Sequence, residues 1–467
     1  MFINNIKSVK NVSEMFVVLL LYLNCIFARR FPEEEYAGYL DTQYAKTNAA
    51  LEKLEHAPQW TPNWPDIAVK MGQVAGVALD PSGRLLAFHR ATNVWDLNTF
   101  SERNVYQGIG DPPIAHPTIL VFNETGNLID SWGQNLFYMP HGITVDNKGN
   151  VWVTDVALHQ VFKFTPENRT KPALVLGEKF IPGDDDEHFC KPSAVAVHSS
   201  GDFFVSDGYC NTRIIKFAAD GTKILQWGKR LGGGPFVLRV PHALALAEAR
   251  GELCAADREN GRVACFRADS GAFSAAFRHW LVGPRVFSLA YSPERGGRLY
   301  IVNGPTVQGG VPVRGYVIDY TSGKLIQTFA PDDGFSNPHD IAISADGSSV
   351  FVAELNPPRV VRFGSVPDKT SVAEDTRTVA SIAPTNSTYT TATSTAVVEM
   401  RGGAWAVWGG SWAAAGGAAG RKTVGRRRWE YGHSEFKLRR LLERRRFTRV
   451  HSDDSEDEPA PMLPPTA

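Results

Sequence analysis

The sequence predicts an all-β fold, a six-bladed β-propeller over residues 69–364. A unit of two hydrophobic runs, joined by a polar turn that usually contains glycine, recurs about every 50 residues. Each second run ends at a polar or charged residue, and these six end residues are His89, Asp155, Asp207, Asp257, Asn303 and Glu354. Short strand-like runs repeated at this period are typical of propeller blades.

A Pro-His pair opens the first run of the second, fourth and sixth units, at His141, His242 and His339. Equivalent positions in alternate blades of a closed ring are related by about 120°, so the three side chains can converge on the central channel. Three neutral imidazoles suit Zn²⁺ and leave a fourth position open. The alternative, that each histidine only ends a turn before a strand, leaves their matched phase unexplained.

Three further polar residues lie at or just after the ends of second runs, namely Arg90, Tyr209 and Arg258. Guanidinium groups pair bidentately with carboxylates, so two of them at the channel mouth predict an anionic substrate. A tyrosine close to cations ionises more easily and can act as a general base. In the alternative interpretation, both arginines pair with aspartates between blades and Tyr209 is a packed ring.

A second metal site is predicted where Asp340 follows His339, a position that holds a small residue in the other two Pro-His units. One acid near the axis favours a hard cation such as Ca²⁺, with backbone carbonyls completing the coordination. The carbonyls of Val77 and Ile143 lie at the matching phase of their units. The alternative is an aspartate that caps a turn.

Composition and cysteine spacing bound the class of protein. The 467 residues carry no formal net charge, which gives no general bias toward nucleic acid. Four of the five cysteines form two close pairs, Cys190 with Cys210 and Cys254 with Cys265. We expect two disulfides and therefore an oxidising compartment. Four free thiols in a cytosolic protein are the alternative.

The N-terminal region is predicted to direct secretion. Residues 1–28 combine Lys7 and Lys10, an apolar core over residues 15–23 and a small residue, Ala28, as a signal peptide does. An uncleaved anchor is the alternative, although the core is short for a membrane span. Residues 29–68 are a polar leader onto the first blade, with a short helix over residues 44–56.

The C-terminal region has three parts. Residues 365–401 are a Ser/Thr-rich stalk or linker. Residues 402–420 lack charge and precede a cluster of Arg and Lys, which fits a weak transmembrane segment, whereas their many glycines fit a low-complexity linker. Residues 421–467 are basic and then acidic, and we expect a disordered tail or a cytoplasmic sorting tail. Both terminal extensions are predicted to be flexible.

Three asparagines, Asn123, Asn168 and Asn386, begin Asn-x-Ser/Thr triplets and are candidate glycosylation sites.

Four stretches closely resemble peptidyl-α-hydroxyglycine α-amidating lyases, the second enzyme of peptide amidation, whose propeller is built from NHL-type repeats. They are residues 138–142, 152–162, 205–211 and 256–262. The resemblance implies a lyase that cleaves C-terminal α-hydroxyglycine to a peptide amide and glyoxylate in neuropeptide and hormone processing. Two stretches depart from the pattern, residues 90–93 and 354–356, but neither removes a proposed ligand.

The resemblance also implies roles for the residues singled out above. Catalytic zinc would take His141, His242 and His339, and structural calcium would take Asp340 with the carbonyls of Val77 and Ile143. Tyr209 would be the base, Arg90 and Arg258 would hold the substrate, and the disulfides would be Cys190–Cys210 and Cys254–Cys265.

The expected setting is the secretory pathway, in the granule lumen or outside the cell, with membrane attachment through residues 402–420 left open. No copper monooxygenase domain precedes residue 69, so we expect a stand-alone, monomeric lyase that receives hydroxylated peptides from a separate enzyme. Two alternatives remain. A calcium-dependent lactonase or esterase would need axial Asp, Asn and Glu ligands. A non-catalytic NHL module binding protein or RNA would need a basic face and no disulfides.

Overall fold

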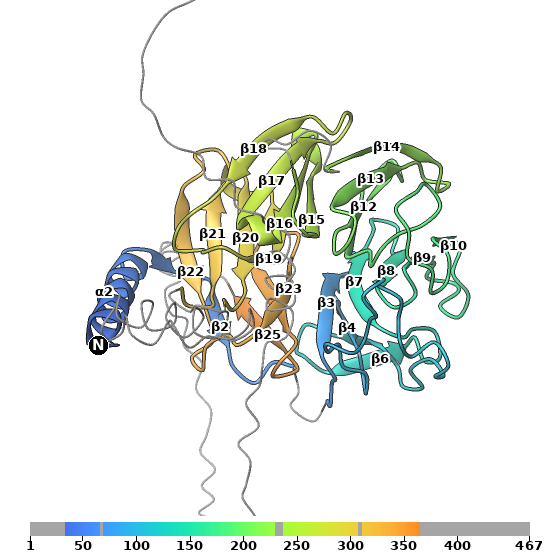
Figure 1. The fold of residues 1–467 in the computed structure, drawn as a ribbon, viewed down its shortest axis with the longest axis horizontal. Coiled ribbons are helices and arrows are strands. Elements are labelled where there is room, and N and C mark those ends of the chain that lie inside the picture. The colour runs from blue at the N-terminus through green and yellow to red at the C-terminus, as the bar shows by residue number, and fades with distance from the viewer. Residues whose placement is uncertain (1–32, 66–68, 229–236, 307–310, 365–467) are drawn as a thin grey trace, which may run out of the picture. The chain divides into compact units, whose positions relative to one another are not determined.

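The computed structural model describes residues 33–65, 69–228, 237–306 and 311–364. Its strands form six separate sheets, which are arranged as blades (Figure 1). The innermost strands contact one another in chain order, and the innermost strand of the sixth blade returns to contact that of the first. The predicted six-bladed β-propeller is therefore confirmed.

Within each blade the strands run antiparallel from the axis outward. Blade one contains β3 (Val74–Leu79), β4 (Leu85–His89), β5 (Ile119–Phe122) and β6 (Leu128–Trp132). Blade two contains β7 (Pro140–Val145), β8 (Val151–Asp155), β9 (Gln160–Phe164) and β10 (Leu174–Leu176). Blade three contains β11 (Ala194–Val197), β12 (Phe203–Asp207), β13 (Arg213–Phe217) and β14 (Lys223–Trp227).

The second half of the ring also carries three short 3₁₀ turns. Blade four contains β15 (Pro241–Ala247), η2 (Glu248–Arg250), β16 (Glu252–Asp257), η3 (Arg258–Asn260), β17 (Arg262–Arg267) and β18 (Phe273–Phe277). Blade five contains β19 (Val286–Ser292), η4 (Glu294–Gly296), β20 (Arg298–Asn303), β21 (Gly315–Asp319) and β22 (Leu325–Phe329). Blade six contains β23 (Pro338–Ile343), β24 (Ser349–Glu354) and β25 (Arg359–Gly364).

The leader contributes strands to the last two blades before the chain enters blade one. β2 (Gln59–Thr61) pairs antiparallel with β25 and becomes the fourth strand of blade six. β1 (Glu55–His56) pairs parallel with β22 at the edge of blade five. The ring is therefore closed by hydrogen bonds between the two ends of the propeller sequence.

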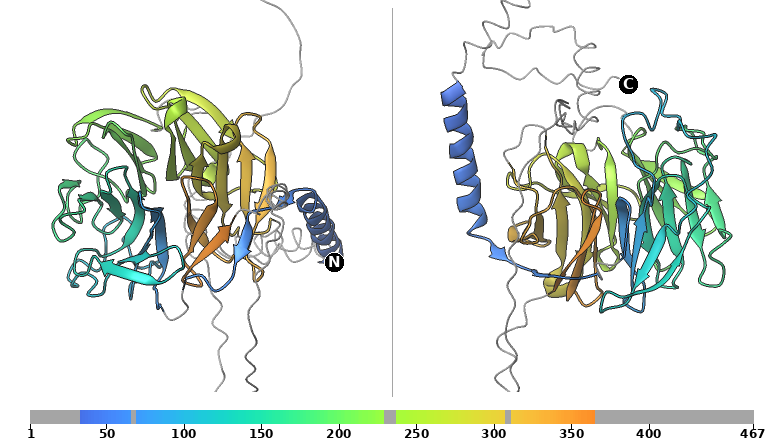
Figure 2. Two further views of the ribbon diagram at one scale, coloured as in Figure 1. Left: turned by 180° about the vertical axis from the view of Figure 1, so that it is seen from behind. Right: turned by 90° about the horizontal axis from the view of Figure 1, so that it is seen from below.

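The leader also contains a helix, α2 (Glu33–Leu51), which lies beside blade five (Figure 2). Its last residue, Leu51, packs with Leu281 and Tyr320. The sequence predicted a helix over residues 44–56, whereas the helix begins earlier, at Glu33, and ends at Leu51. It ends there because residues 55–56 pair with β22, a contact with a strand far along the chain.

The hydrophobic core is divided among the blade interfaces. Six clusters of buried side chains occur, one between each pair of neighbouring blades, including the first and sixth. The second strand of a blade is buried on both faces, so it is a nearly continuous apolar run rather than an alternating one. Val153, Val205 and Val352 in these strands have no exposed surface.

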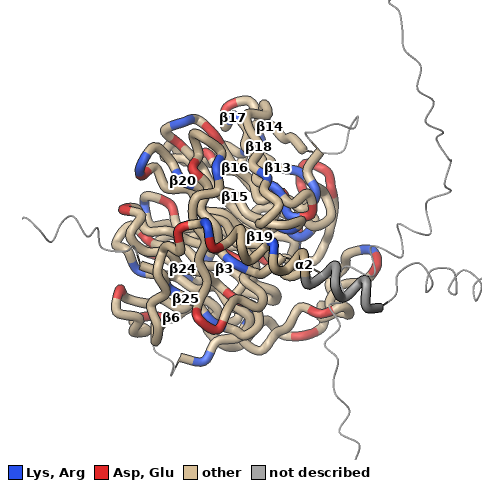
Figure 3. Tube along the Cα trace, turned by 90° about the vertical axis from the view of Figure 1, so that its left-hand side faces the viewer, with Lys and Arg blue, Asp and Glu red and all other residues tan. Residues whose placement is uncertain are grey.

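Several predictions of the sequence fall on residues outside those described. They are the signal peptide at 1–28, the stalk at 365–401, the apolar segment at 402–420, the tail at 421–467 and the glycosylation triplet at Asn386. Among the described residues, no helix has the length and apolar character needed to cross a membrane. Basic and acidic residues are interspersed along the blades in the view of Figure 3, rather than gathered by sign.

Candidate active site and metal centre

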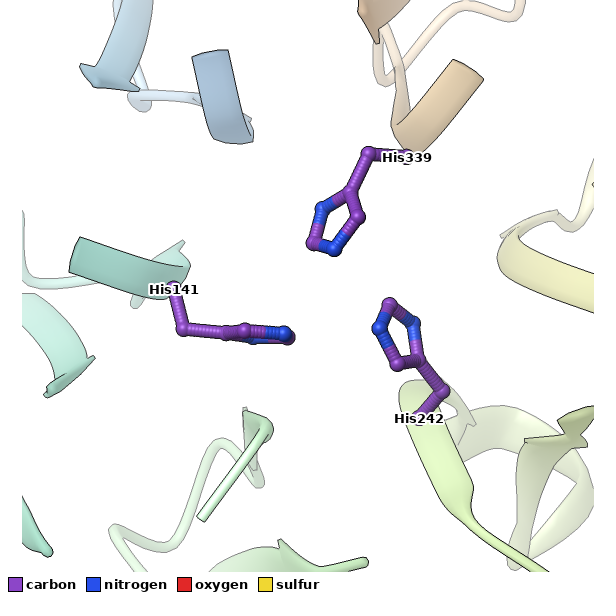
Figure 4. A group of neighbouring side chains, drawn as sticks. All are labelled: His141, His242 and His339. Carbon is purple, nitrogen blue, oxygen red and sulfur yellow. The ribbon is translucent and has the colours of Figure 1, made fainter. Parts of the chain in front are cut away.

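Three histidines meet at the propeller axis. His141, His242 and His339 are each the second residue of an innermost strand, in blades two, four and six. Their side chains point toward one another (Figure 4), and their ring centroids are 4.7–4.9 Å apart. They are the group of metal-ligand side chains found among the described residues, with ligand atoms within 4.8 Å of one another. The structure thus brings together the three residues predicted from the Pro-His repeat.

Each imidazole is oriented by a carbonyl from the following blade. The Nδ1 atoms of His141, His242 and His339 lie 2.8, 2.7 and 2.6 Å from the carbonyl oxygens of Ser193, Phe287 and Ala75. Because a carbonyl can only accept, each Nδ1 carries the proton and each Nε2 presents a lone pair. A carbonyl that accepts the Nδ1–H in this way fixes the tautomer and the orientation of metal-binding histidines.

The environment keeps these rings neutral. Burial lowers the pKa of all three histidines, and His141 and His242 are lowered further by the proximity of His339. For His339 the pKa falls to about 3, through burial and the charge of Arg90. Three buried neutral imidazoles with convergent lone pairs could hold a metal ion, since a neutral Nε2 is the state that binds one.

Tyr209 places its hydroxyl beside this group, from the loop that follows β12. The hydroxyl oxygen is 2.8 Å from Nε2 of His141 and 2.9 Å from Nε2 of His242. A phenol has one proton and can donate to only one of these nitrogens, so the other contact sets two lone pairs against each other. A cation shared by the nitrogens and the oxygen relieves that repulsion, which is why the residues fit a metal ion.

The pKa of Tyr209 is subject to opposing effects. Burial raises the pKa of its phenol above the ordinary value, while the nearby guanidiniums of Arg258 and Arg90 lower it. The net effect is a raised pKa, so the two arginines alone do not give the easier ionisation predicted from the sequence, and Tyr209 needs a further cation beside its hydroxyl to act as a base. Its ring packs 4.9 Å from that of Trp95.

Arg90 is buried at the end of β4. Its Nε donates to the carbonyl of Pro140 at 3.0 Å and its Nη1 to Oε1 of Gln73 at 2.7 Å. Its Nη2 is buried and has no hydrogen-bond partner among the described residues. Burial lowers the pKa of Arg90 to about 10. The alternative in which Arg90 pairs with an aspartate is not found among the described ion pairs, and Nη2 remains a donor for a ligand.

Arg258 begins the turn η3 and lies over the ring of Tyr209, at 5.2 Å from its centroid. Its Nε donates to Oε1 of Glu259 at 3.0 Å. The ion pair is therefore with the next residue of the chain and not with an aspartate of another blade. The Tyr209 hydroxyl is within the influence of both predicted guanidiniums.

A cavity of about 260 Å³ along the axis is lined by the three histidines and by Val77, Ile143 and Asp340, the residues predicted for calcium. Oδ2 of Asp340 accepts the backbone N–H of Val77 at 3.0 Å, and Oδ1 accepts the hydroxyl of Ser288 at 2.6 Å. Burial raises the pKa of Asp340 to about 6. No ion pair with Asp340 occurs among the described residues, so a partly buried carboxylate faces a cavity that suits a hard cation.

Three side chains near the site were not predicted from the sequence. Trp95 comes from the long β4–β5 connection and lies 6.2 Å from His141, ring centroid to ring centroid. The wide gap between His89 and Asp155 in the sequence could have indicated an insertion there, although not its contribution to the site. Glu259 could have been suspected beside Arg258, whereas Arg285, which shares Oε1 of Glu259, has no sequence signal.

Both predicted disulfides are present. Cys190 is bonded to Cys210, with Cα atoms 5.4 Å apart, which ties the loop of Tyr209 to the segment before β11. Cys254 and Cys265 are opposite each other on β16 and β17 and are bonded across the hairpin.

The glycosylation candidates within the described chain lie in turns at the surface. Asn123 follows β5, and its Oδ1 accepts the N–H of Asn127 at 2.9 Å. Asn168 is exposed and follows β9.

Comparison with known proteins gives consistent relatives. The NHL repeat model matches residues 137–164 and 189–217, which fall in blades two and three. Peptidyl-alpha-hydroxyglycine alpha-amidating lyase 1 of Drosophila melanogaster is 46% identical over 329 residues, covering 67% of this chain and 61% of that protein. Lyase 2 of the same organism is 44% identical, covering 64% of this chain and 72% of that protein.

The shared region is also found in longer proteins. Peptidyl-glycine alpha-amidating monooxygenase B of Xenopus laevis is 47% identical over 308 residues, covering 64% of this chain but 35% of that protein. The aligned part thus spans 61% of the first Drosophila relative and about a third of the frog relative.

Proposed function

This chain belongs to the peptidyl-α-hydroxyglycine α-amidating lyase family, and we propose that it cleaves a C-terminal peptidyl-α-hydroxyglycine to the peptide amide and glyoxylate. One observation carries the proposal. The Tyr209 hydroxyl lies within 2.9 Å of two converging imidazoles, and the guanidiniums of Arg90 and Arg258 act on the same phenol. A base, a metal site and two cations for a carboxylate are the groups that this reaction needs.

The metal of the three histidines is proposed to be zinc, because three neutral imidazoles with an open fourth position are typical of catalytic zinc sites. When bound there, the ion would supply Lewis-acid polarisation of the substrate hydroxyl and lower its pKa. His141, His242 and His339 would hold it through Nε2, with Nδ1 kept protonated by the three backbone carbonyls.

Arg90 and Arg258 are proposed to bind the terminal carboxylate. Arg90 has a buried Nη2 with no hydrogen-bond partner among the described residues, which is an unused donor. Nε of Arg258 donates to Glu259, and its guanidinium also hydrogen-bonds the side chain of Tyr209. The guanidinium is thus held beside the phenol, where its remaining N–H groups would bind a carboxylate. Binding at both cations fixes the α-carbon of the hydroxyglycine next to Tyr209.

Tyr209 is proposed to accept the proton of the α-hydroxyl. As that proton leaves, the C–O bond of the hydroxyl becomes the aldehyde carbonyl of glyoxylate, and the C–N bond breaks. Its electron pair goes to the amide nitrogen, which takes up a proton. The reaction consumes no net proton and needs no oxidant, because the proton lost by the hydroxyl balances the one gained by the nitrogen.

Calcium is proposed for the axial cavity beside Asp340. The carboxylate supplies one hard oxygen, and the carbonyls of Val77 and Ile143 would supply others. Both residues line the cavity with Asp340. A cation there would compensate the buried charge and join the innermost strands of several blades, so its role is structural.

The wider setting follows from the substrate. An α-hydroxyglycine arises by hydroxylation of a peptidyl glycine, so a monooxygenase has to supply it, and relatives of this chain carry that name. We further propose a secretory location, which the two disulfides support. We also propose glycosylation at Asn123, Asn168 and Asn386 and a monomeric protein, with residues 402–420 as the candidate for membrane attachment.

The experiment that tests the proposal is glyoxylate release from a synthetic α-hydroxyglycine-extended peptide. The full chain, with its disulfides formed, is assayed as purified, after chelation and after zinc is restored. We expect release that chelation abolishes and zinc restores. A folded, zinc-loaded protein that releases no glyoxylate would refute the lyase assignment.

A further inference from the structure

A second pair of charged residues lies behind Arg258. Oε1 of Glu259 accepts hydrogen bonds from two guanidiniums, Nε of Arg258 at 3.0 Å and Nη2 of Arg285 at 3.1 Å. Arg285 is itself held by its Nη1, which donates to the carbonyl of Pro305 at 3.0 Å. The carboxylate is therefore a bridge between the arginine of the site and an arginine anchored in blade five.

The two guanidiniums also share an aromatic ring. Their central carbons lie 5.1 Å (Arg258) and 4.9 Å (Arg285) from the centroid of Phe287. The carbonyl of Phe287 accepts the Nδ1–H of His242, so the same residue orients a metal-site histidine. A displacement of Phe287 would therefore affect both the two guanidiniums and the orientation of His242.

The turn that carries Glu259 is fixed by backbone contacts. The N–H of Arg258 donates to the carbonyl of Val240 at 3.1 Å, and the N–H of Glu259 donates to that of Arg239 at 3.0 Å. These carbonyls lie just ahead of the Pro-His pair of blade four. The backbone of η3 is therefore set, and what the side chains decide is where the guanidinium of Arg258 points.

We propose that Glu259 is a positioning residue, held by Arg285, that fixes the guanidinium of Arg258 against Tyr209 and turns its terminal nitrogens toward the substrate carboxylate. The inference rests on the proposed function and extends it to two residues with no role so far. Glu259 does not contact the reacting atoms, because it acts through Arg258.

Charge balance supports this role. Two guanidiniums that share one ring repel each other, and a carboxylate between them offsets that repulsion. The side chains of Arg258, Glu259 and Arg285 are 11%, 30% and 23% exposed, so the cluster is open enough to receive a ligand and buried enough for its charges to matter.

The first test is Glu259→Gln, which keeps the shape and removes the charge. Its matched control is Glu294→Gln, an exposed glutamate in η4, at the other end of β19 from Arg285. For the peptidyl-α-hydroxyglycine substrate, we expect E259Q to raise KM about tenfold, the cost of a weakened charge pair, with little change in kcat, zinc content or melting temperature. Glu259→Asp should recover part of the loss, and an E259Q protein with the KM of wild type would overturn the proposal.

A double variant tests whether Glu259 acts through Arg258. On an Arg258→Met background both the Nε donor and the positive charge are gone, so E259Q should cause no further rise in KM. Additive effects would show that Glu259 acts independently and would contradict its positioning role.

A binding measurement separates this inference from the lyase assignment. Peptides ending in glycine and in glycinamide differ only in the terminal carboxylate and lack the α-hydroxyl that cleavage requires. We expect wild type to prefer the carboxylate and E259Q to lose about tenfold of that preference. Wild type without glyoxylate release would refute the lyase assignment, whereas unchanged carboxylate preference in E259Q would refute the inference alone.

Discussion

Asp155 accepts a hydrogen bond from the backbone N–H of Met139 at 2.9 Å, two residues ahead of the metal-site histidine of blade two. A related contact occurs at the other two histidines. Glu354 accepts the N–H of Asn337, also two residues ahead of its histidine, at 3.0 Å, whereas Asp257 accepts that of Arg239, three residues ahead of His242, at 2.6 Å. The acid that ends the second strand of a blade thus holds the segment that delivers the imidazole.

Replacing Asp155 by alanine should destabilise the fold. Its two oxygens accept four backbone N–H groups, from Tyr138, Met139, Ala157 and Leu158. Each buried donor left without an acceptor costs about 1–3 kcal/mol, and with partial relaxation we expect the free energy of unfolding to fall by about 3 kcal/mol. Urea denaturation measures this free energy. Asp130→Ala, at an exposed ion pair, should change stability by no more than about 0.5 kcal/mol, and an equal loss there would contradict the argument.

The acid at the end of the second strand explains why the three histidines could be predicted from the sequence. In all three blades the proline before the histidine pairs with the acid across the first two strands. The offset between histidine and acid is therefore nearly constant, and a fixed offset is visible in a sequence. The phase of the blades, and with it the convergence of three imidazoles, could be predicted from that repeat.

Other parts could not be predicted, because they depend on contacts between distant segments. β2 becomes a strand only by pairing with β25, about 300 residues further along the chain, and its three residues have no strong pattern of their own. Arg285 contributes to the site through Glu259 and not through any repeat position. Trp95 reaches Tyr209 from an irregular connection whose path no periodicity describes.

Substituting His242 by alanine should abolish metal binding and activity. Only two imidazoles would remain, so a metal ion would lose one of its three protein ligands. We expect zinc per protein to fall from about one to a small fraction, measured by atomic emission on purified protein. His198→Ala, at an exposed pair with Glu248, should keep full zinc and glyoxylate release. Full activity in H242A would refute the three-histidine site.

Removing only the hydroxyl of Tyr209 should separate chemistry from binding. In Tyr209→Phe the ring can still pack against Trp95 and Arg258. We expect kcat for glyoxylate release to fall by about 10²–10⁴, the usual contribution of a general base, with zinc content retained. Tyr44→Phe, at a tyrosine that is 55% exposed, is the control. A Y209F enzyme with the wild-type kcat would exclude this residue as the base.

Acid should destabilise the protein through histidines outside the metal site, and His159 is the clearest. It is fully buried, its Nδ1 accepts the N–H of Lys191 at 3.0 Å, and burial lowers its pKa to about 3. In the unfolded chain the same imidazole takes up a proton near pH 6.5. Between these values the unfolded state binds more protons, so this contribution to stability falls as the pH falls, by about 1.4 kcal/mol per pH unit.

The variant His159→Asn isolates that contribution from the buried acids, whose raised pKa values act in the opposite direction. Asparagine offers an oxygen to the N–H of Lys191 and tolerates the positive φ of 56° at this position. Wild type should have a higher free energy of unfolding than H159N at pH 6.5, and this advantage should fall by about 2 kcal/mol by pH 5. Urea midpoints across this range measure it, with the exposed His116→Asn as the control. If the difference between wild type and H159N stays constant with pH, the imidazole is not held neutral by the fold.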